Sequence, residues 1–577
     1  MVKKKAKQGM RPTFLESMSQ VYSLRHENIV ILTGDVNGLF WSAPSGGFVS
    51  LEQALNSELR DKFNVIRMDI ARGLSFYERE ADDEVTRICE STDGHYTPIV
   101  RIKALKNMIK SSLHSPLEAL VLLHGMGEAF VRVRKLEPGI KPMCVIIQFA
   151  GALFSAGDYS RLSELDRQRL ILFLSWVSDP MFREGPELIV LINPVKSEIN
   201  AKVLALPNTA HIEIDLPKQE ERKQFVHYFL AYHTGVEFSH GMEKFVEDTA
   251  GLALDNIKDL LEVAAKKDDP ISRHHVVAEV NNILQSQLGD IIRIKYPSHT
   301  RKDIVGYKET GEIFTNIFER CEDPETAVAA ILVSGPNGSG KTFQLEAYAG
   351  ESGRVVIELA GIRGSYFGET DKFFELLRWH ITTFGKILIL VDEAHTAFGS
   401  VHSGQTHQTE QRLSGNIIKM MGDPRYFGKV LWGLMTSRPD ELDPDIKSRA
   451  PIQVPIFDLE GEERKDFVSE LFKRKGIQPT EEELVEVLSK TDYYSARDYR
   501  NLTAEMLAQR RKNPDCTILE VLMGWQASKS IKRQREFQEM IAALHCSYPK
   551  LLPEKYRDIP DDVLMRQVEE LKQLLRQ

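Results

Sequence analysis

The amino-acid sequence predicts an α/β protein that contains two modules, each with a parallel β-sheet covered by helices on both faces. In the second half of the chain, helix-like stretches alternate with short apolar runs at 329–334, 354–359, 386–391, 430–435 and 452–456. This alternation is typical of a parallel sheet built from βαβ units. Residues EERKQFV at 220–226 in the first half match EERKDFV at 462–468 in the second. The match predicts two copies of one module.

The first half gives weaker signals of the same kind. Apolar runs predict strands at 28–33, 64–70, 143–147 and 187–192. Helices are predicted at 51–63 and 117–134, and a helical region is expected after the last strand, up to about residue 267. Residues 80–116 are mixed and polar and are interpreted as an insertion. The strand that ends at Ile192 and Asn193 is aligned with the one that ends at Thr436 and Ser437.

Five regions are expected along the chain. They are a basic disordered tail (1–19), a degenerate first module (20–267), a linker (268–299) with a helix at 276–294, an active second module (300–514) and a helical C-terminal extension (515–577). The pattern of the second module becomes wholly helical at 460–510, which predicts a helical lid after its sheet. A corresponding lid is expected at the end of the first module.

Composition limits the classes of function. The net charge of −9 gives no overall electrostatic reason to bind nucleic acid or anionic lipid. The five cysteines lie far apart without a C-x-x-C pair, so neither a zinc site nor a disulfide framework is predicted. Their use fits a reducing cytosol, and a cytoplasmic location is expected. There is no apolar run of about 18 residues, so no membrane span is predicted.

The strongest motif is GPNGSGKT at 335–342, which directly follows a predicted buried strand. Glycines allow successive backbone N–H groups to point inward, and the helix that begins near Thr342 offers its positive end to phosphate. Lys341 is expected to reach the β- and γ-phosphates, and Thr342 is expected to hold Mg²⁺. ATP and Mg²⁺ are therefore the predicted cofactors. The alternative is a glycine-rich loop without a ligand, and the flanking strand and helix argue against it.

A second group of polar residues follows the next predicted strands. Asp392 and Glu393 end the apolar run 387–391. Beside a phosphate loop, Asp392 would organise the Mg²⁺ shell and Glu393 would polarise the attacking water; the alternative is an acid pair that caps the next helix. Thr436 or Ser437 is expected near the γ-phosphate, where it would orient the water.

Two arginines follow these motifs. Arg449 is expected on a loop, from which it would complete the site of a neighbouring subunit as arginine fingers do. Arg497 lies in the helical segment and could contact the same nucleotide. The alternative for Arg449 is a solvated surface arginine.

The motifs DIVGY (303–307), GPNGSGKT, VDEAH, TSRPDELD and SYFGE (365–369) resemble those of AAA-type ATPases with tandem modules, such as valosin-containing protein and N-ethylmaleimide-sensitive fusion protein. The resemblance covers about 300–510 and is weaker over 20–265. It implies a ring, commonly a hexamer, with nucleotide between subunits and a polypeptide substrate in the central pore.

The resemblance also implies roles for particular residues. The pore would be lined by Tyr366, Phe367 and Gly368. The catalytic residues would be Lys341, Glu393 and Arg449, and the Mg²⁺ ligands Thr342 and Asp392. The nucleotide would contact Ile304, Gly306, Gly335, Pro336, Asn337, Gly338, Ser339, Gly340, Lys341, Thr342, Phe343, Ser437 and Arg497.

Some positions depart from the family pattern. Ser448 precedes Arg449 where two arginines are usual, Ser437 stands in place of asparagine, and Arg497 in place of a small residue. In the first module, the loop GDVNG (34–38) lacks the Gly-Lys-Thr ending, and Gln148 and Phe149 replace the acids. We therefore expect the first module to be a structural ring layer, with Phe76 and Tyr77 as a second pore belt.

Three classes of function remain from the sequence. The first is an ATP-driven protein remodeller or unfoldase, a chaperone-like activity powered by the second module. The alternatives are a nucleic-acid motor or loader, which the acidic net charge disfavours, and a scaffold that only binds ATP, which an intact Glu393 disfavours. No H-E-x-x-H occurs, so any proteolysis would need a separate protease, and an adaptor or protease is expected to dock through the C-terminal extension.

Overall fold

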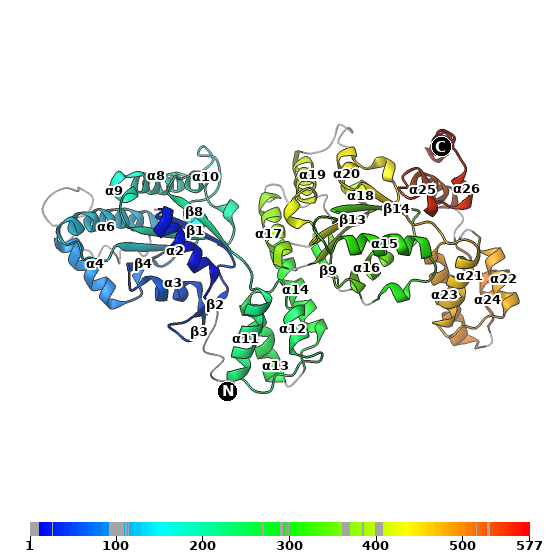
Figure 1. Ribbon diagram of the computed structural model, residues 1–577, viewed down its shortest axis with the longest axis horizontal. Helices are drawn as coiled ribbons and strands as arrows, with labels where there is room; N and C mark the ends of the chain where they lie inside the picture. The colour runs from blue at the N-terminus through cyan, green and yellow to red at the C-terminus, as the bar shows by residue number, and fades with distance from the viewer. Residues whose placement is uncertain are drawn as a thin grey trace. The chain divides into compact units, whose positions relative to one another are not determined.

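The computed structural model divides the chain into two compact units (Figure 1). Unit 1 consists of Met1–Val280 with Asp371–Thr383, and unit 2 of Asn281–Thr370 with Phe384–Gln577. The structure describes residues 11–91, 115–359, 370–398 and 408–576, together with 109 and 112, except for 26, 268–269, 289–291, 296, 298, 384–385, 493, 515 and 528–530. None of the helices in these described ranges has both the length and the apolar character needed to cross a membrane.

Unit 1 is built on a six-stranded sheet with the order β5-β4-β6-β7-β1-β8. All neighbouring strands are parallel except β4 and β5. The strands are β1 (Ile29–Gly34), β4 (Asn64–Asp69), β5 (Gly73–Phe76), β6 (Met143–Gln148), β7 (Leu188–Ile192) and β8 (Thr209–Ile214). A separate hairpin joins β2 (Leu39–Ser42) to β3 (Gly47–Ser50). The four strands predicted in this half are present within one or two residues.

Two strands of unit 1 correct the sequence-based predictions. β8 lies in a region expected to be helical; its polar residues alternate with apolar ones and two are exposed, as suits an edge strand, so no apolar run marks it. β5 and the residue after it carry Phe76 and Tyr77, which were expected in a pore. Both side chains pack against the hydrophobic core instead, so the expectation of a second pore belt there is wrong.

Helices cover both faces of the unit 1 sheet (Figure 1). One core cluster joins one sheet face to α4 (Arg79–Ser91), α6 (Pro116–Leu136) and α8 (Glu164–Ser178). The other joins the opposite face to α2 (Thr13–Arg25) and α3 (Leu51–Leu59). The tail expected at 1–19 is therefore helical from Thr13, because α2 buries Phe14 and Met18. The insertion expected at 80–116 begins with α4, which buries Val85 and Ile88, while most of its remaining residues lie outside the described ranges.

Three helices follow the last strand of unit 1. They are α11 (Gln219–Tyr232), α12 (Met242–Asp248) and α13 (Leu254–Lys267). The next helix, α14 (Arg273–Leu288), ends before the predicted linker helix does. Ile292–Lys295 form strand β9 instead, because Ile292 and Ile294 are buried where β9 pairs with β11.

Unit 2 contains a second six-stranded sheet with the order β14-β10-β13-β12-β11-β9. The five predicted strands are present as β10 (Ala330–Ser334), β11 (Val355–Leu359), β12 (Ile387–Val391), β13 (Val430–Thr436) and β14 (Ile452–Pro455). They are parallel to one another, and only the edge strand β9 is antiparallel. β10, β12 and β13 are completely buried, which explains their strong apolar signal.

Most helices of unit 2 belong to three groups. α15 (Lys308–Arg320) and α16 (Lys341–Glu351) pack on the sheet. The lid consists of α21 (Gly461–Lys473), α22 (Glu481–Lys490), α23 (Ala496–Lys512) and α24 (Ile518–Gly524), which share one core. The C-terminal group is α25 (Lys532–Leu544), α26 (Glu554–Arg557) and α27 (Asp561–Arg576).

The two sheets place their parallel strands in the same order. We number the parallel strands of each sheet from one to five in chain order. Across the sheet, starting at β8 in unit 1 and at β14 in unit 2, they then lie in the order five, one, four, three, two. A sixth, antiparallel strand follows in both, but β5 comes after the second parallel strand in the chain whereas β9 precedes the first. The protein therefore contains two α/β modules of one architecture, with helices on both faces of each sheet.

Candidate functional site

The phosphate loop predicted from the sequence connects β10 to α16 in unit 2. Two of its glycines are required, because neighbouring atoms leave no room for a Cβ. Gly335 has φ +139°, and a Cβ there would lie 2.2 Å from the Ile456 carbonyl oxygen. Gly338 has φ +91°, and a Cβ there would lie 2.8 Å from Ser495 Oγ in the lid. The loop is therefore fixed between the end of β14 and the lid helices.

Lys341 is the first residue of α16. Its Nζ donates hydrogen bonds to the carbonyl oxygens of Gly335 (2.9 Å) and Pro336 (3.0 Å). Burial lowers the pKa of Lys341 to about 8, although Asp392 and Glu393 favour its charged form. A buried ammonium beside the N-terminus of a helix attracts an anion, because both supply positive charge.

The two predicted acids follow β12. Asp392 accepts the backbone N–H of Glu393 at 2.9 Å through Oδ1. Glu393 has φ 50° and directly precedes α18 (Ala394–Ala397). It stands at the N-cap position of this helix, but its side chain makes no capping hydrogen bond and is 56% exposed. Both acids lie on the wall of the cavity that also contains the phosphate loop.

A histidine connects the acid pair to the next strand, and sequence reasoning did not single it out. His395 Nδ1 lies 2.8 Å from Thr436 Oγ1, and His395 Nε2 lies 3.6 Å from Glu393 Oε2. Thr436 Oγ1 also accepts the backbone N–H of Arg438 at 2.9 Å. With Thr436 as the donor to Nδ1, the histidine N–H would be on Nε2 and would face Glu393. The pKa of His395 is lowered, mainly by burial.

A cavity of about 440 Å³ brings the predicted residues together. Predicted residues on its wall are Ile304, Asn337, Gly338, Ser339, Gly340, Lys341, Thr342, Phe343, Asp392, Glu393, Ser437 and Arg497. Gly306, Gly335 and Pro336 lie beside it without forming the wall. The size fits a mononucleotide, since ligand pockets commonly reach a few hundred Å³.

The lid supplies wall residues that were not predicted. Phe467 and Leu471 come from α21, Arg474 directly follows it, and Arg500 joins the predicted Arg497 from α23. Their i, i+4 and i, i+3 spacings place them on one face of each helix, but spacing does not show which face meets the cavity. The wall therefore has apolar side chains at the lid, suited to a base, and positive charge for phosphates.

The wall chemistry fits ATP and Mg²⁺. Thr342 offers a hydroxyl oxygen and Asp392 a carboxylate oxygen, and these are the donors that Mg²⁺ prefers. The buried Ser339 Oγ has no hydrogen-bond partner among the described residues, so the phosphate loop retains an unused polar atom.

The remaining predicted residues do not lie on this wall. Arg449 is exposed and ends α20 (Pro444–Arg449), so it is helical rather than on a loop. Its Nη1 lies beside Gly422, 2.8 Å from where a Cβ would be. Tyr366, Phe367 and Gly368 lie outside the described residues.

In unit 1, the corresponding sheet edge repeats two backbone features of unit 2 with different side chains, although the β2–β3 hairpin lies between its loop and α3. Gly34 has φ +88°, and a Cβ there would lie 2.3 Å from the Ile214 carbonyl oxygen, as at Gly335. Phe149 has φ 53° and precedes a four-residue helix, as Glu393 does. Gln148 donates to Glu52, at the start of α3, and accepts from Arg67 at 3.2 Å.

Strand pairing corrects one sequence alignment between the units. Ile192 pairs with Leu32, two residues before Gly34. Met435 pairs with Val333, two residues before Gly335. Asn193 therefore corresponds to Thr436 and not to Ser437. Its amide accepts the Gly151 N–H at 2.9 Å, while Thr436 contacts His395 at the matching position.

Comparisons with known proteins agree with this division. Residues 331–457 match the family model described as "ATPase family associated with various cellular activities (AAA)". Unit 2 contains an AAA ATPase domain. Residues 5–215 match a different model, "AAA+ chaperone, N-terminal Rossmann-like domain". The AAA match, together with the cavity, supports ATP hydrolysis by the second unit.

Curated relatives match with low identity. A cell division cycle protein 48 homolog of Archaeoglobus fulgidus is 24% identical over 48% of this chain and 39% of its own length. A putative 26S proteasome regulatory subunit homolog of Methanocaldococcus jannaschii is 25% identical over 36% of this chain and 58% of its own length. Human spastin is 28% identical over 30% of this chain and 29% of its own length. The chain thus spans less than two thirds of each of these relatives.

Proposed function

We propose that this chain is an ATP-driven remodelling ATPase that forms a ring, hydrolyses ATP in its second unit and moves a polypeptide through the centre of the ring. The observation that carries the proposal is the cavity of unit 2, whose wall joins the phosphate loop, the acid pair and the lid arginines. An ATPase needs these groups around one bound nucleotide.

The residues of unit 2 divide the work of hydrolysis. Lys341 and the backbone amides that begin α16 bind and orient the phosphates, and Mg²⁺ held by Thr342 and Asp392 would offset their negative charge. Glu393 orients the attacking water and accepts its proton. His395 fixes the direction of the Glu393 carboxylate through the hydrogen bond to Thr436.

Unit 1 is proposed to be a duplicated module that serves as a structural layer without hydrolysis. Gln148 and Phe149 stand at the positions of the acids and cannot polarise water as a carboxylate does. Glu52 at the start of α3 places a carboxyl group on the wall of a small pocket of unit 1, and Asp35 lies buried in the loop after β1. Burial raises the pKa of Asp35 to about 7, so near neutral pH it adds partial negative charge.

The ring and its pore are proposals that rest mainly on the resemblance to tandem AAA ATPases. Arg449 supports a ring, because its exposed guanidinium lies off the wall of its own cavity and would be free to reach the nucleotide of a neighbour. A hexamer is proposed on the resemblance alone, as is substrate contact through Tyr366, Phe367 and Gly368.

The location and the partners of the protein are proposals that rest on the sequence and on the resemblance. A cytoplasmic location, a protein substrate and an adaptor or separate protease agree with the sequence. Met565 and Leu574 on α27 are exposed apolar side chains, which suits a docking surface at the C-terminus.

ATP hydrolysis with two kinds of added substrate tests the choice of function. We expect an unfolded protein to stimulate turnover and single-stranded DNA to have no effect. Tyr366→Ala is expected to keep the basal rate and lose substrate unfolding. Stimulation by DNA alone would favour a nucleic-acid motor and contradict the proposal.

Mixing two inactive variants tests the shared site. Lys341→Ala and Arg449→Ala are each expected to be nearly inactive alone. In mixed rings, an intact Lys341 site can face an intact Arg449, so part of the activity returns. Mixtures that stay as inactive as the separate variants, although native mass spectrometry shows mixed rings, would rule out a finger in trans.

A further inference from the structure

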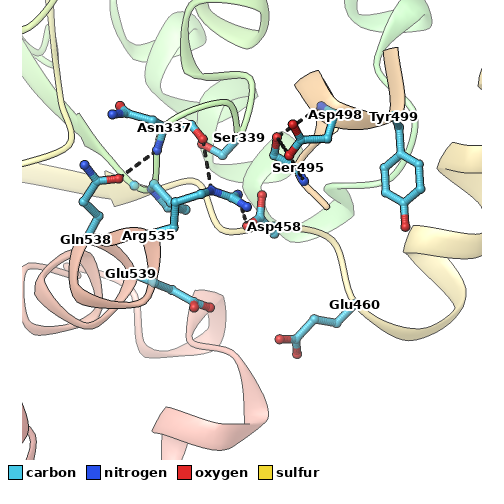
Figure 2. A network of polar contacts seen from close by, with 12 residues as sticks. Asn337, Ser339, Asp458, Glu460, Ser495, Asp498, Tyr499, Arg535, Gln538 and Glu539 are labelled. Carbon is cyan, nitrogen blue, oxygen red and sulfur yellow. Dashed lines mark hydrogen bonds and ion pairs between the residues drawn. The ribbon is translucent and has the colours of Figure 1, made fainter. Parts of the chain in front are cut away.

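Helix α25, the first helix of the C-terminal group, contacts the phosphate loop of its own unit (Figure 2). Gln538 Oε1 accepts the backbone N–H of Asn337 at 3.1 Å, and Arg535 Nε donates to the Asn337 carbonyl oxygen at 3.2 Å. Gln538 is 2% exposed and Arg535 9%, so water competes little for either contact. One helix turn thus binds both backbone groups of one loop residue.

A buried acid holds Arg535 in place. Arg535 forms an ion pair with Asp458, which follows β14. Burial raises the pKa of Asp458 to about 6, although Arg535 opposes this shift. Because the arginine fork contacts Asp458 and the Asn337 carbonyl at the same time, its position on the loop is defined by two partners.

The loop is held from two further sides. Tyr307 donates its hydroxyl to the Ser339 carbonyl oxygen at 3.0 Å, and the Arg497 N–H donates to the Gly338 carbonyl at 3.3 Å. α25 also reaches the segment after β13, because Arg438 lies 4.8 Å over the ring of Phe537. Helix α25 therefore contacts two segments that border the cavity, the phosphate loop and the segment after β13.

We infer that Arg535 and Gln538 are positioning residues for nucleotide binding, which act through the backbone of the phosphate loop. Hydrogen bonds to both the N–H and the C=O of Asn337 fix the peptide groups on either side of it. The amides that follow, from Gly338 to Thr342, are then ordered before phosphate binds. Ordering a loop in advance removes that cost from binding.

The inference rests on the proposed ATPase function and deepens it, since it gives the C-terminal extension a role at the nucleotide site. Asn337 lies on the phosphate loop, whereas the acid pair lies between β12 and α18 on the wall of the same cavity. Loss of the α25 contacts should therefore weaken nucleotide binding and leave the chemical step nearly unchanged. This separates positioning of the loop from a direct role in hydrolysis.

The test compares two glutamines on the same helix of the full-length chain. Gln538→Met removes the acceptor at nearly constant volume, and Gln534→Met makes the same change at an exposed position one turn earlier. We expect Gln538→Met to raise the Kd for a fluorescent ADP analogue about 5-fold, the effect of losing one ordinary hydrogen bond. KM for ATP should rise by the same factor, with kcat within about 2-fold. Gln534→Met should change neither constant.

A second variant covers the case in which Gln538→Met does not fold. Arg535→Lys keeps a charge beside Asp458 but loses the fork that also reaches Asn337. We expect a similar rise in Kd with a thermal midpoint close to wild type in the absence of nucleotide. An unchanged Kd in the folded variants, an equal rise in Gln534→Met, or a loss confined to kcat would overturn the inference. If the wild type binds ADP but does not hydrolyse ATP, the proposed function fails while the Kd comparison still tests α25.

Discussion

Phe149 in unit 1 and Glu393 in unit 2 occupy the same place in two sheets of the same strand order. Both have a left-handed backbone, with φ 53° and 50°, and both precede a four-residue helix. A residue other than glycine in this conformation costs about 1 kcal/mol. Strain at an active site is often attributed to catalysis. Here the same strain occurs where no acid is present, so it belongs to the fold and not to the chemistry.

The glycines lead to the same conclusion. Gly34 and Gly335 each leave no room for a Cβ, because a carbonyl oxygen of the adjacent edge strand, or of the residue just after it, would lie within 2.3 Å of it. Unit 1 therefore repeats the backbone conformation of unit 2 at Gly34 and Phe149, but the β2–β3 hairpin separates its loop from α3, and the side chains of Glu52 and Gln148 contact each other. The two units thus share backbone conformation at two positions of this sheet edge, and they differ in the side chains there and in the hairpin that precedes α3 of unit 1.

The largest expected difference comes from the paired positions themselves. Glu393→Gln should lower kcat at least about 100-fold, because it removes the proton acceptor, and should keep ATP binding. Phe149→Leu is the matched change in unit 1 and should leave kcat within about 2-fold. Steady-state ATPase assays and ADP titrations measure both. A large loss of kcat in Phe149→Leu would show that unit 1 contributes to hydrolysis.

The position two residues further along in each unit gives a smaller effect of a different kind. His395→Ala should lower kcat about 10-fold with an unchanged Kd, since Glu393 loses the group that orients it. Gly151→Ala is the matched change, and its Cβ would lie 2.9 Å from Asn193 Oδ1. We expect it to destabilise unit 1 by about 1–3 kcal/mol without lowering kcat at a permissive temperature. Calorimetry together with ATPase assays separates the two outcomes, and an unchanged kcat in His395→Ala would remove its proposed role.

Asp35 should make the stability of unit 1 depend on pH. Burial, with Asp255 and Glu221 nearby, raises its pKa from 3.8 to about 7, while the Gly38 N–H opposes the shift. The folded state therefore holds this proton more tightly than the unfolded state. The stabilisation is complete below about pH 4 and is lost as the pH rises through 7.

Asp35→Asn removes the loss of stability at high pH, because asparagine does not ionise, and it keeps a hydrogen-bond acceptor for Gly38. Its advantage in stability should grow from pH 4 to pH 7 and then remain constant, at about 4 kcal/mol for a pKa raised from 3.8 to about 7. Calorimetric unfolding at a series of pH values measures this, with the exposed Asp61→Asn as control. An advantage that does not change with pH would show that the Asp35 carboxyl is not buried as described.

The sequence was sufficient for elements that carry a local signal. Completely buried strands such as β10 and β12 appear as unbroken apolar runs, and glycines at fixed spacing mark the phosphate loop. Edge strands such as β8 and β9 lack that signal, because their polar residues face solvent and their pairing partners are distant in the chain.

The residues of the site, too, were predicted only where the sequence carries a local signal. Lys341, Asp392 and Glu393 were predicted because each directly follows or ends a recognisable segment. His395 was missed because its role depends on Thr436, 41 residues away. The contacts of Arg535 and Gln538 with Asn337 span about 200 residues, and no local pattern in the sequence indicates them.

Nucleotide stoichiometry tests the central claim most directly. Isothermal titration of the full-length chain with ADP should give one site per chain. Lys341→Ala should abolish that binding, with a rise in Kd of about 100-fold or more, because a buried cation that pairs with phosphate is lost. Asn37→Ala, beside the smaller pocket of unit 1, should leave it unchanged. Two sites per chain, or tight ADP binding that persists in Lys341→Ala, would contradict the account.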